Sequence, residues 1–311
     1  MNTFTKSPLS HPEQVALLKT RGMLFEEGSQ AEFSLKHVNY YRLSAYWKIF
    51  EIKDAFGKTC FQEKTSFKTI INLYNFDKKL RLFLTPLIET FEVSLRSNWA
   101  YEISVGLKNS HSYLEFSLYE EKNIKKIQEN IAQIKQKFVG SEEDFSRHYR
   151  NKYKTPELPP TWTICEIFTF GNLMYFYSYL NGEYRRKISS NYELDESIFL
   201  SFLKNFLRVR NICAHHGRLW NTKLNTCSIR YPKSKVNNNS ILVDSINTKN
   251  NENIYNTVVF LIHIQNLIEK ETSWKKEFID FIDSAIKNGV ITTDQLEKLM
   301  GFPENWKLLP I

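Results

Sequence analysis

The sequence predicts a mainly α-helical fold, and three observations lead to this prediction. Apolar residues recur at intervals of three and four in several long segments, which is the period of an amphipathic helix. The 311 residues include only ten glycines and nine prolines, too few for the frequent turns of a β-sandwich or barrel. Apolar residues make up 42% of the chain, which is enough to fill a sizeable core.

Two helices are expected in the first half of the chain. The earlier one runs from about residue 72 to 102, where leucines and other apolar residues repeat at helical intervals. Pro86 lies inside it and is expected to kink or break the helix near Phe83, because proline removes a backbone donor and clashes with the preceding turn. The second helix, near residues 120–138, carries one apolar stripe formed by Ile124, Ile127, Ile131, Ile134 and Phe138.

Further helical segments follow. The run WTICEIFTFGNLMYFYSYL comes after the prolines of ELPPTW, which favour a helix start, and it is predicted to be one helix central to the core. A helix from about Glu196 to His216 is expected to end with Gly217 as its left-handed cap. Residues from Val258 to about Ile286 should supply one or two more helices.

Two segments show no helical pattern. CSIRYP, residues 227–232, is expected to form a short strand. The segment KSKVNNNSILVDSINTKNNENI, residues 233–254, is rich in Asn, Ser and Lys. It is expected to be the least ordered stretch and to act as a linker before a small carboxy-terminal helical part.

The composition narrows the classes of function. Basic residues outnumber acidic ones by 42 to 34, and the formal charge of +8 favours a polyanionic partner, nucleic acid before membrane. The four cysteines lack zinc-ligand spacing, and no glycine-rich phosphate loop, HExxH or GxSxG pattern occurs, so neither a metal nor a cofactor is expected. The amino terminus lacks a signal-peptide pattern and the longest apolar run, VVFLI, is too short to span a membrane, so a cytoplasmic location is expected.

One stretch, FLRVRNICAHHGRLWN, places polar residues on a helix that is otherwise apolar. Asn211 and His215 are four residues apart and share a face, and the long side chain of Arg210 can swing toward that face. The unpaired carbonyls of the last turn are expected to attract Arg218. Three apolar residues are expected to face the core instead: Leu207, Ile212 and Leu219.

An imidazole beside a guanidinium suits the cleavage of RNA without a metal. A histidine can move a proton to or from the ribose 2′-hydroxyl or the leaving 5′-oxygen. An arginine can stabilise the additional charge of a phosphorane-like transition state. The alternative interpretation is that these side chains only satisfy a helix C-terminus and line a solvated face. The spacing by itself leaves both interpretations open.

The segment RNICAHHGRLWN closely resembles the signature of the Abi-like (abortive infection) family, within the HEPN superfamily of helical ribonucleases. That superfamily places a histidine a short spacer after an arginine, usually with a polar residue directly after the arginine. Arg210 and Asn211 match, and the histidine is either His215 or His216; His215 is preferred because it shares a face with Asn211. Three more blocks resemble the family in the same order, VNYYRLSAYWKIF, FDKKLRLFLTPLIETFEVSLRSNWA and HYRNKYKTPELPPTWTICEIFTFGNL, which extends the resemblance over most of residues 38–221.

The resemblance implies a HEPN-like helical bundle with additional helices at both ends. The implied division is an amino-terminal helical extension with the VNYYRLSAYW block (1–65), a HEPN-like core (66–230), and a linker with a small carboxy-terminal helical part (231–311). It also implies a homodimer whose two motifs face each other across a shared groove.

The activity implied by the resemblance is that of a metal-independent endoribonuclease, a toxin that cleaves cellular or phage RNA and halts the growth of the infected cell. Arg210 would stabilise the transition state, His215 or His216 would act as general acid or base, and Asn211 would hold the histidine or the phosphate. Some relatives are kept silent by a small non-coding RNA antitoxin. The alternative is a non-catalytic RNA-binding protein of a toxin–antitoxin or phage-defence system.

Two other groups of residues are candidates. In ETFEVSLR, Glu89, Glu92 and Arg96 share one helix face, either as a surface ion-pair ladder or with Glu92 or Arg96 orienting the motif across a cleft. In SRHYRNKYK, cations alternate with Tyr149 and Tyr153, and such charges and rings bind the phosphates and bases of single-stranded RNA. The predicted RNA-binding cations, to which Arg218 is added, are Arg147, Arg150, Lys152 and Lys154, although an exposed basic loop can also be merely solvated.

Overall fold

The computed structural model describes residues 3, 5, 7–28, 30–232, 240–269 and 272–310, and it confirms a mainly α-helical fold. The described helices are α1 (His11–Thr20), α2 (Ala31–His37), α3 (Tyr40–Trp47), α4 (Phe67–Leu107), α5 (Ile124–Val139), α6 (Asp144–Lys152), α7 (Thr161–Ile164), α8 (Phe170–Tyr179), α9 (Gly182–Ser190), α10 (Glu196–Ala214), α11 (Ser240–Ser245), α12 (Tyr255–Ile268), α13 (Trp274–Lys287) and α14 (Thr293–Met300). Among the described residues, two strands, β1 (Glu51–Lys53) and β2 (Thr59–Phe61), form one antiparallel hairpin that the sequence did not predict.

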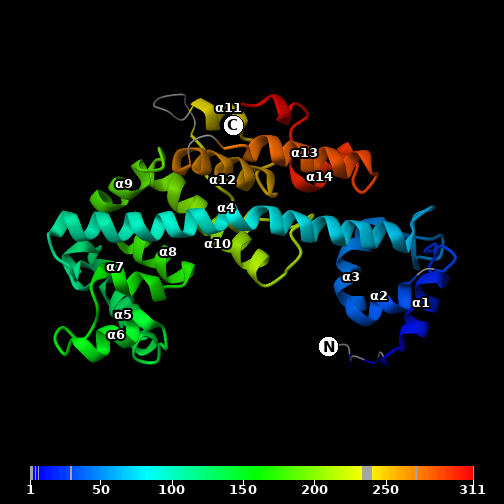
Figure 1. The fold of residues 1–311 in the computed structure, drawn as a ribbon. Coiled ribbons are helices and arrows are strands. Elements are labelled where there is room, and N and C mark those ends of the chain that lie inside the picture. The colour runs from blue at the N-terminus through cyan, green and yellow to red at the C-terminus, as the bar shows by residue number, and fades with distance from the viewer. Residues whose placement is uncertain are drawn as a thin grey trace.

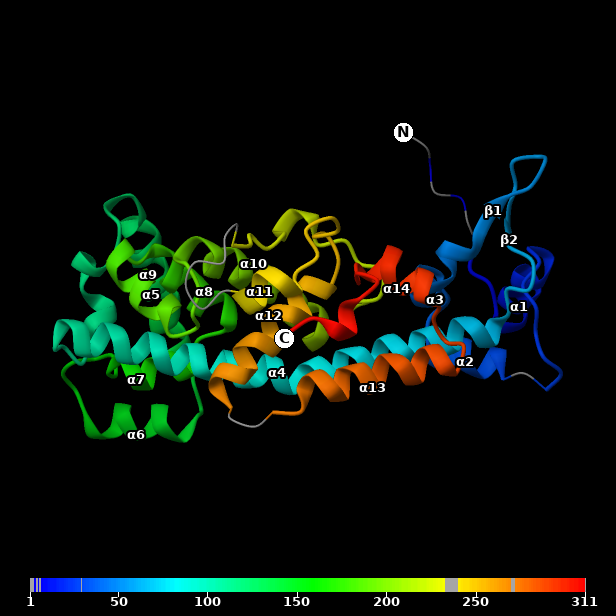
Figure 2. The ribbon, with the colours of Figure 1, turned by 90° about the horizontal axis from the view of Figure 1, so that it is seen from above.

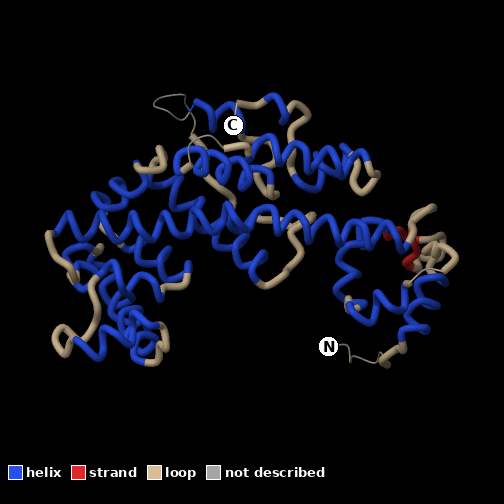
Figure 3. The backbone as a smooth tube through the Cα atoms, viewed as in Figure 1, coloured by secondary structure: helices blue, strands red, loops and turns tan. Residues whose placement is uncertain are grey.

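Helix α4 is the longest helix in the described part of the chain, and the other groups of helices are arranged along it. It has 41 residues and crosses the whole width of Figure 1. Helices α1–α3 and the hairpin lie at its amino-terminal end, and helices α5–α9 gather toward its carboxy-terminal end (Figures 1 and 2). Figure 3 shows the described strands confined to the amino-terminal end of this arrangement. Because every other group of helices packs on α4, residues far apart in sequence meet along it.

Pro86 does not break α4. The helix continues from Phe67 to Leu107, so the predicted break near Phe83 is wrong. The hydroxyl of Thr85 donates a hydrogen bond to the carbonyl of Arg81 at 2.9 Å. Apolar side chains of α4 on both sides of the proline are buried in the core. This tertiary packing outweighs the roughly 3 kcal/mol that a proline costs in a helix interior.

The long apolar run after residue 160 forms two helices rather than one. Helix α7 begins directly after Pro160, as predicted, but it ends in a short 3₁₀ turn, and α8 starts anew at Phe170. Thr169 is the N-cap of α8: its hydroxyl accepts a hydrogen bond from the N–H of Asn172, whose side chain accepts one from the N–H of Thr169. This capping box outweighs the continuous apolar pattern and divides the segment.

Aromatic rings fix α10 on α4. The ring of Phe91 on α4 lies 4.8 Å from that of Phe206 and 5.3 Å from that of Phe202, both on α10. Phe202 in turn stacks on Phe260 of α12 at 5.3 Å. Pairs of this kind add about 0.5–1.5 kcal/mol to the burial of their apolar area. The predicted helix from residue 196 is confirmed, and its carboxy-terminal end is held firmly against α4.

The carboxy-terminal segment completes the core. All residues of α12 from Tyr255 to Gln265 are buried, and the helix packs against both α4 and α10. Helix α13 lies along the amino-terminal half of α4 in Figure 2, where Phe281 stacks on Phe83 at 5.7 Å. The prediction of one or two helices from Val258 to about Ile286 is therefore confirmed: α12 and α13 cover the side of α4 that would otherwise expose its apolar residues.

The structure differs from the predictions for the two segments without a helical pattern, residues 227–232 and 233–254. CSIRYP forms no strand; it begins in a 3₁₀ turn and continues without regular structure. Of the expected linker, residues 233–239 lie outside the described residues. In the rest of this segment, the side chain of Asn251 accepts a hydrogen bond from Asn256 of α12 at 2.7 Å, and that of Asn247 donates to the carbonyl of Gly301 at 2.9 Å. Asparagines that suggested disorder here bind backbone and one another.

Candidate functional site

Helix α10 ends in a Schellman arrangement directly at the motif. The N–H of Gly217 donates to the carbonyl of Ile212 at 2.7 Å, and the N–H of His216 donates to that of Cys213 at 3.2 Å. The left-handed residue is His216, with φ of 55°, so the prediction of Gly217 as the left-handed cap is wrong by one residue. Gly217 instead allows the loop to pack closely on Ile212, because a Cβ at this position would lie only 3.3 Å from Cγ2 of Ile212. The left-handed conformation costs a non-glycine residue about 1–2 kcal/mol.

Arg210 and His216 line the same groove between α10 and α4. Nε of Arg210 donates to Oε2 of Glu92 at 3.2 Å, and Nη2 of Arg96 donates to Oε1 of the same carboxylate at 3.2 Å. Glu92 therefore bridges two guanidinium groups, and it connects α4 directly to the motif. The groove has a volume of about 590 Å³ and is lined by Lys78, Arg81, Leu82, Thr85, Ile88, Glu89, Glu92, Val93, Arg96, Arg210, Cys213, Ala214 and His216.

The groove is open rather than sealed. The side chain of Arg210 is 31% exposed, whereas Glu92 and Arg96 are 14% and 13% exposed. Glu89 is exposed at the rim, so Glu89, Glu92 and Arg96 do not form a uniform surface ladder. Arg210 and His216 thus contribute a guanidinium and an imidazole to the groove, and the carboxylate of Glu92 binds Nε of that guanidinium.

The other two motif residues lie on a different face of α10. Asn211 and His215 are exposed, they share a face as expected, and neither lines the groove. One residue along a helix turns the side chain by roughly 100°, so Asn211 points well away from its neighbour Arg210. The structure therefore brings Arg210 together with His216 and keeps Asn211 with His215.

A buried carboxylate, Asp77, holds the motif loop in place. Its Oδ1 accepts hydrogen bonds from the backbone N–H groups of Leu219 at 3.0 Å and Trp220 at 2.6 Å. Its Oδ2 accepts from the hydroxyl of Tyr46 on α3 at 2.6 Å and pairs with Arg81 one turn along α4. Asp77 is fully buried. Burial and the adjacent carboxylate raise the pKa of Tyr46 well above its usual range, so the hydroxyl remains a donor.

Sequence reasoning missed Asp77, although it lies in a block that was singled out. The available signal was an aspartate four residues before an arginine, in line with the apolar residues Phe76, Leu80 and Leu84 of the same helix. Its four partners come from three segments, α3, α4 and the loop after α10, which are the segments that carry three of the four sequence blocks. Buried charges need several partners, and these partners are only visible in three dimensions.

Two cations join the motif loop to the amino-terminal extension. Arg42 on α3 donates to the carbonyl of His216, and its guanidinium lies 5.8 Å from the ring centre of Tyr74. Nη1 of Arg218 donates to the carbonyl of Ala45 on α3 at 2.9 Å. The expectation that the last-turn carbonyls of α10 would attract Arg218 is therefore wrong, because the loop turns this side chain toward α3. Leu219 is buried as expected, while Leu207 and Ile212 are half-buried against the core.

The predicted basic patch lies on a helix, α6, and much of it is used internally. Arg150 donates to the carbonyls of Phe138 at 2.5 Å and Ser141 at 2.8 Å, which caps the end of α5. Tyr149 is buried, and its hydroxyl donates to the carbonyl of Leu158 at 3.0 Å, so it cannot stack on a base.

The remaining cations of the patch are more exposed. Arg147 pairs with Asp144 at 2.5 Å, Lys152 lies 5.2 Å from the ring centre of Tyr153, and Lys154 is exposed. Figures 1 and 2 both place α6 toward the carboxy-terminal end of α4, away from the end of α10. The structure does not bring this patch together with the groove.

The residues around the motif also bear on two other kinds of site, a reactive thiolate and a metal site. Burial raises the pKa of the Cys213 thiol to about 12, so this groove residue is not a thiolate at neutral pH. Among the described residues, no group of three or more His, Cys, Asp or Glu side chains is arranged to hold a metal ion. Within the same part of the chain, no helix is long and apolar enough to cross a membrane.

Comparison with known proteins gives one family. The family model described as Abi-like protein matches residues 34–221, which is more than half of the chain and includes both the Asp77 cluster and the motif. Searches of the curated proteins and of the solved structures found no significant match.

Proposed function

Because this chain belongs to the Abi-like family, which links it to abortive infection and phage defence, we propose that it is a metal-independent endoribonuclease of the HEPN type. It would act as an antiphage toxin on cellular or phage RNA. The observation that carries the proposal is that Arg210 and His216, two residues of the motif, line one open groove. An imidazole can act as general acid or base, and a guanidinium supplies a positive charge.

The chemistry requires no group beyond these side chains. The ribose 2′-oxygen loses its proton and attacks the adjacent phosphorus, the bond from phosphorus to the 5′-oxygen breaks, and the leaving oxygen gains a proton. The products are a 2′,3′-cyclic phosphate and a 5′-hydroxyl. His216 would transfer one of the two protons, and Arg210 would neutralise the charge that develops on the phosphoryl oxygens. Glu92 would position Arg210, since it accepts from Nε and leaves the outer edge of the guanidinium free.

His216, rather than His215, is the proposed proton carrier. It lines the groove with Arg210, whereas His215 lies on the exposed face with Asn211. The left-handed backbone of His216 is held by the Schellman bonds and by Arg42, which donates to its carbonyl. A strained residue at a candidate site is consistent with a functional requirement for that residue. Asn211 would then contact the phosphate of the bound strand instead of the histidine.

A homodimer would supply the second proton carrier. Leu82 and Val93 are 61% and 55% exposed, and both border the groove on α4. Two copies that meet along this edge would bury these apolar side chains and place two motifs across one shared groove. In that arrangement one His216 takes the proton from the 2′-hydroxyl and the partner's His216 donates to the 5′-oxygen. A small non-coding RNA antitoxin that occupies the same groove would inhibit the enzyme.

The test is cleavage of RNA by the purified protein in EDTA, compared between His216→Ala and its matched control His215→Ala. The proposal expects cleavage by the wild type, a loss of about 10²-fold or more in His216→Ala, and a much smaller loss in His215→Ala. Analysis of the product ends should show cyclic phosphate.

The alternative is a protein that binds RNA without cleaving it. That function predicts no cleavage by the wild type and a loss of RNA affinity in Arg210→Ala. A result in which only His215→Ala is inactive would keep the enzyme but reverse the assignment of the histidine.

A further inference from the structure

One face of α10 carries a continuous polar and basic stripe. Its members are spaced four, three and four residues apart, so they follow one line along the helix, and all of them are exposed: Lys204, Arg208, Asn211 and His215. The one acidic residue of α10, Glu196, lies two turns before the stripe begins. In the described part of the chain, neither Lys204 nor Arg208 has an ion-pair partner.

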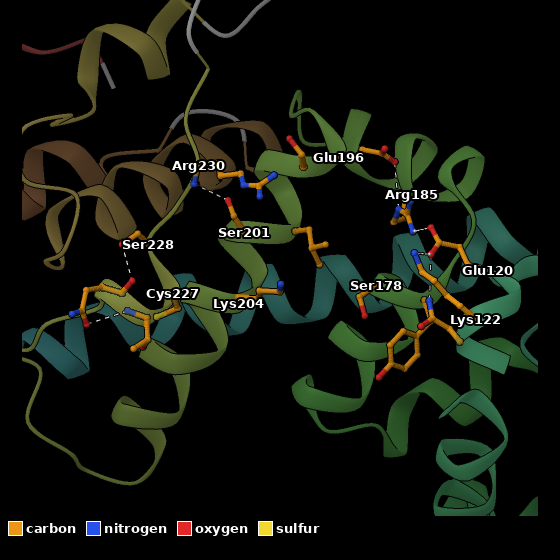
Figure 4. Close-up of a pocket in the computed structure, with 16 residues that line it drawn as sticks. Glu120, Lys122, Ser178, Arg185, Glu196, Ser201, Lys204, Cys227, Ser228 and Arg230 are labelled. Atoms are coloured by element: carbon orange, nitrogen blue, oxygen red, sulfur yellow. Dashed lines mark hydrogen bonds and ion pairs between the residues drawn. The ribbon is translucent and has the colours of Figure 1, made fainter. Parts of the chain in front are cut away.

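A hydroxyl-lined pocket adjoins the amino-terminal end of the stripe. Figure 4 shows Lys204 and Arg230 on one side of this pocket, with Glu120, Lys122 and Arg185 on the other. Its volume is about 610 Å³, and its lining includes five serine and threonine side chains, Ser178, Ser197, Ser201, Thr226 and Ser228.

The carboxylates of the pocket are already neutralised. Arg185 lies 2.7 Å from Glu120 and 3.4 Å from Glu196, and Lys122 lies 2.8 Å from Glu120. The guanidinium of Arg230 and the ammonium of Lys204 have no such partner among the described residues. Positive charge at this end of α10 is therefore uncompensated and exposed.

We propose that this face, from the pocket of Lys204 and Arg230 through Arg208 to Asn211 and His215, is a binding track for the phosphodiester backbone of a single RNA strand. The inference deepens the proposed function: it adds a path by which the substrate extends beyond the groove of Arg210 and His216. The eleven residue steps from Lys204 to the C-cap His215 span roughly 16 Å at 1.5 Å per step. The track thus reaches several nucleotides away from the cleavage point.

The chemistry of this face favours nucleic acid over an acidic protein. Phosphate groups are contacted by Arg, Lys, Ser, Thr and Asn side chains, and these residue types make up most of the stripe and of the pocket lining. The centre of a protein–protein interface is usually apolar and aromatic. On α10 the apolar residues face inward, and the stripe itself contains none. The placement also explains why Asn211 and His215 share a face that is not the face of Arg210.

The experiment uses the full-length protein with two charge reversals on the track, Lys204→Glu and Arg208→Glu together. The matched control reverses two exposed lysines elsewhere, Lys36→Glu and Lys276→Glu, so that net charge changes equally. Binding of a 20-nucleotide single-stranded RNA is measured on a His216→Ala background at several salt concentrations. Thermal unfolding of each variant checks that the fold is retained.

The track variant should bind at least tenfold more weakly than the control pair. In a plot of log affinity against log salt concentration, its negative slope should become shallower by about 1.4, since each lost contact with a single strand removes about 0.7 from the slope. In proteins that keep His216, kcat/KM should increase with the length of the RNA substrate, because a longer strand reaches the track. This increase should be lost in the track variant and kept in the control.

Two results would overturn the track. One is equal weakening by both pairs, which would indicate net charge alone; the other is unchanged RNA binding by the track variant, which would leave this face to a protein partner. The outcomes also separate the two proposals. If the charge reversals do not change RNA cleavage, the binding track is rejected and the endoribonuclease proposal stands. If the reversals weaken RNA binding but the wild type cleaves no RNA, the endoribonuclease proposal is rejected and the track stands.

Discussion

Helix α4 carries two acid–arginine pairs with the same spacing, and they have opposite environments. Asp77 and Arg81 are four residues apart, as are Glu92 and Arg96. The first pair is closed: Asp77 is fully buried, and its carboxylate accepts from Tyr46 on α3, from two N–H groups of the loop after α10 and from Arg81 one turn along α4. The second pair is open, because Glu92 extends to Arg210 at the edge of a groove.

The difference teaches that spacing identifies an ion pair but not its role. A buried pair with all partners supplied fixes the relative positions of the segments that supply them. A pair at a groove keeps one charged edge available for a ligand. In this molecule Asp77 of the closed pair binds the loop after α10, and Glu92 of the open pair binds the guanidinium of Arg210 on α10 itself. Four substitutions sharpen the comparison, from the largest expected effect on stability to the smallest.

Asp77→Asn should destabilise the protein most. The substitution leaves the guanidinium of Arg81 buried without its counter-charge and weakens the bonds from the loop after α10, at a cost of about 3–5 kcal/mol in the free energy of unfolding. Urea denaturation measures it. The double variant Asp77→Asn/Arg81→Met should recover part of the loss. A cost below about 1 kcal/mol would show that the cluster is not what holds the loop.

Tyr46→Phe should cost about 1.5–3 kcal/mol, because it removes a hydrogen bond to a buried charged group and leaves the ring in place. The same urea experiment applies. Tyr41→Phe, on the same helix but 85% exposed, is the control and should change stability little. If the two variants unfold at the same urea concentration, the hydroxyl of Tyr46 contributes nothing to the closed cluster.

Glu92→Gln should cost about 1 kcal/mol, less than the two variants above, because the side chain of Arg210 is 31% exposed to water and the amide can still accept one hydrogen bond. RNA cleavage should nevertheless decrease by about tenfold or more, since Arg210 is no longer held by a charge. The two measurements together test the role: a large loss of stability with normal cleavage would make Glu92 a structural residue like Asp77.

His216→Gly should have the smallest effect on stability, a change of about 0–1 kcal/mol in the stabilising direction. Glycine removes the strain of the left-handed residue, and the greater freedom of the unfolded chain offsets part of this gain. Cleavage should be abolished. His216→Val, whose branched side chain disfavours positive φ, should instead destabilise the protein. Retained cleavage in the glycine variant would exclude His216 as the proton carrier.

Several features were readable from the sequence because their cause is local. The helical class follows from apolar spacing, and the helix from residue 196 with its motif was located to within two residues. The errors have non-local causes. Pro86 was expected to kink or break α4, and the helix is not broken because the flanking residues are buried by distant helices. The single helix expected after residue 160 is divided by a capping box whose threonine and asparagine are hidden in an apolar run.

The sequence alone determined the helical class, the location of the motif and the family resemblance, because periodicity and residue identity are properties of neighbours in the chain. Only the tertiary structure decided that Asp77 is fully buried among its partners, that Arg210 and His216 line one groove, and that Asn211 and His215 lie on another face. The physical reason is that burial and hydrogen-bond partners depend on segments that are distant in sequence, and these determine whether a charged side chain stabilises the fold or remains free to act on a ligand.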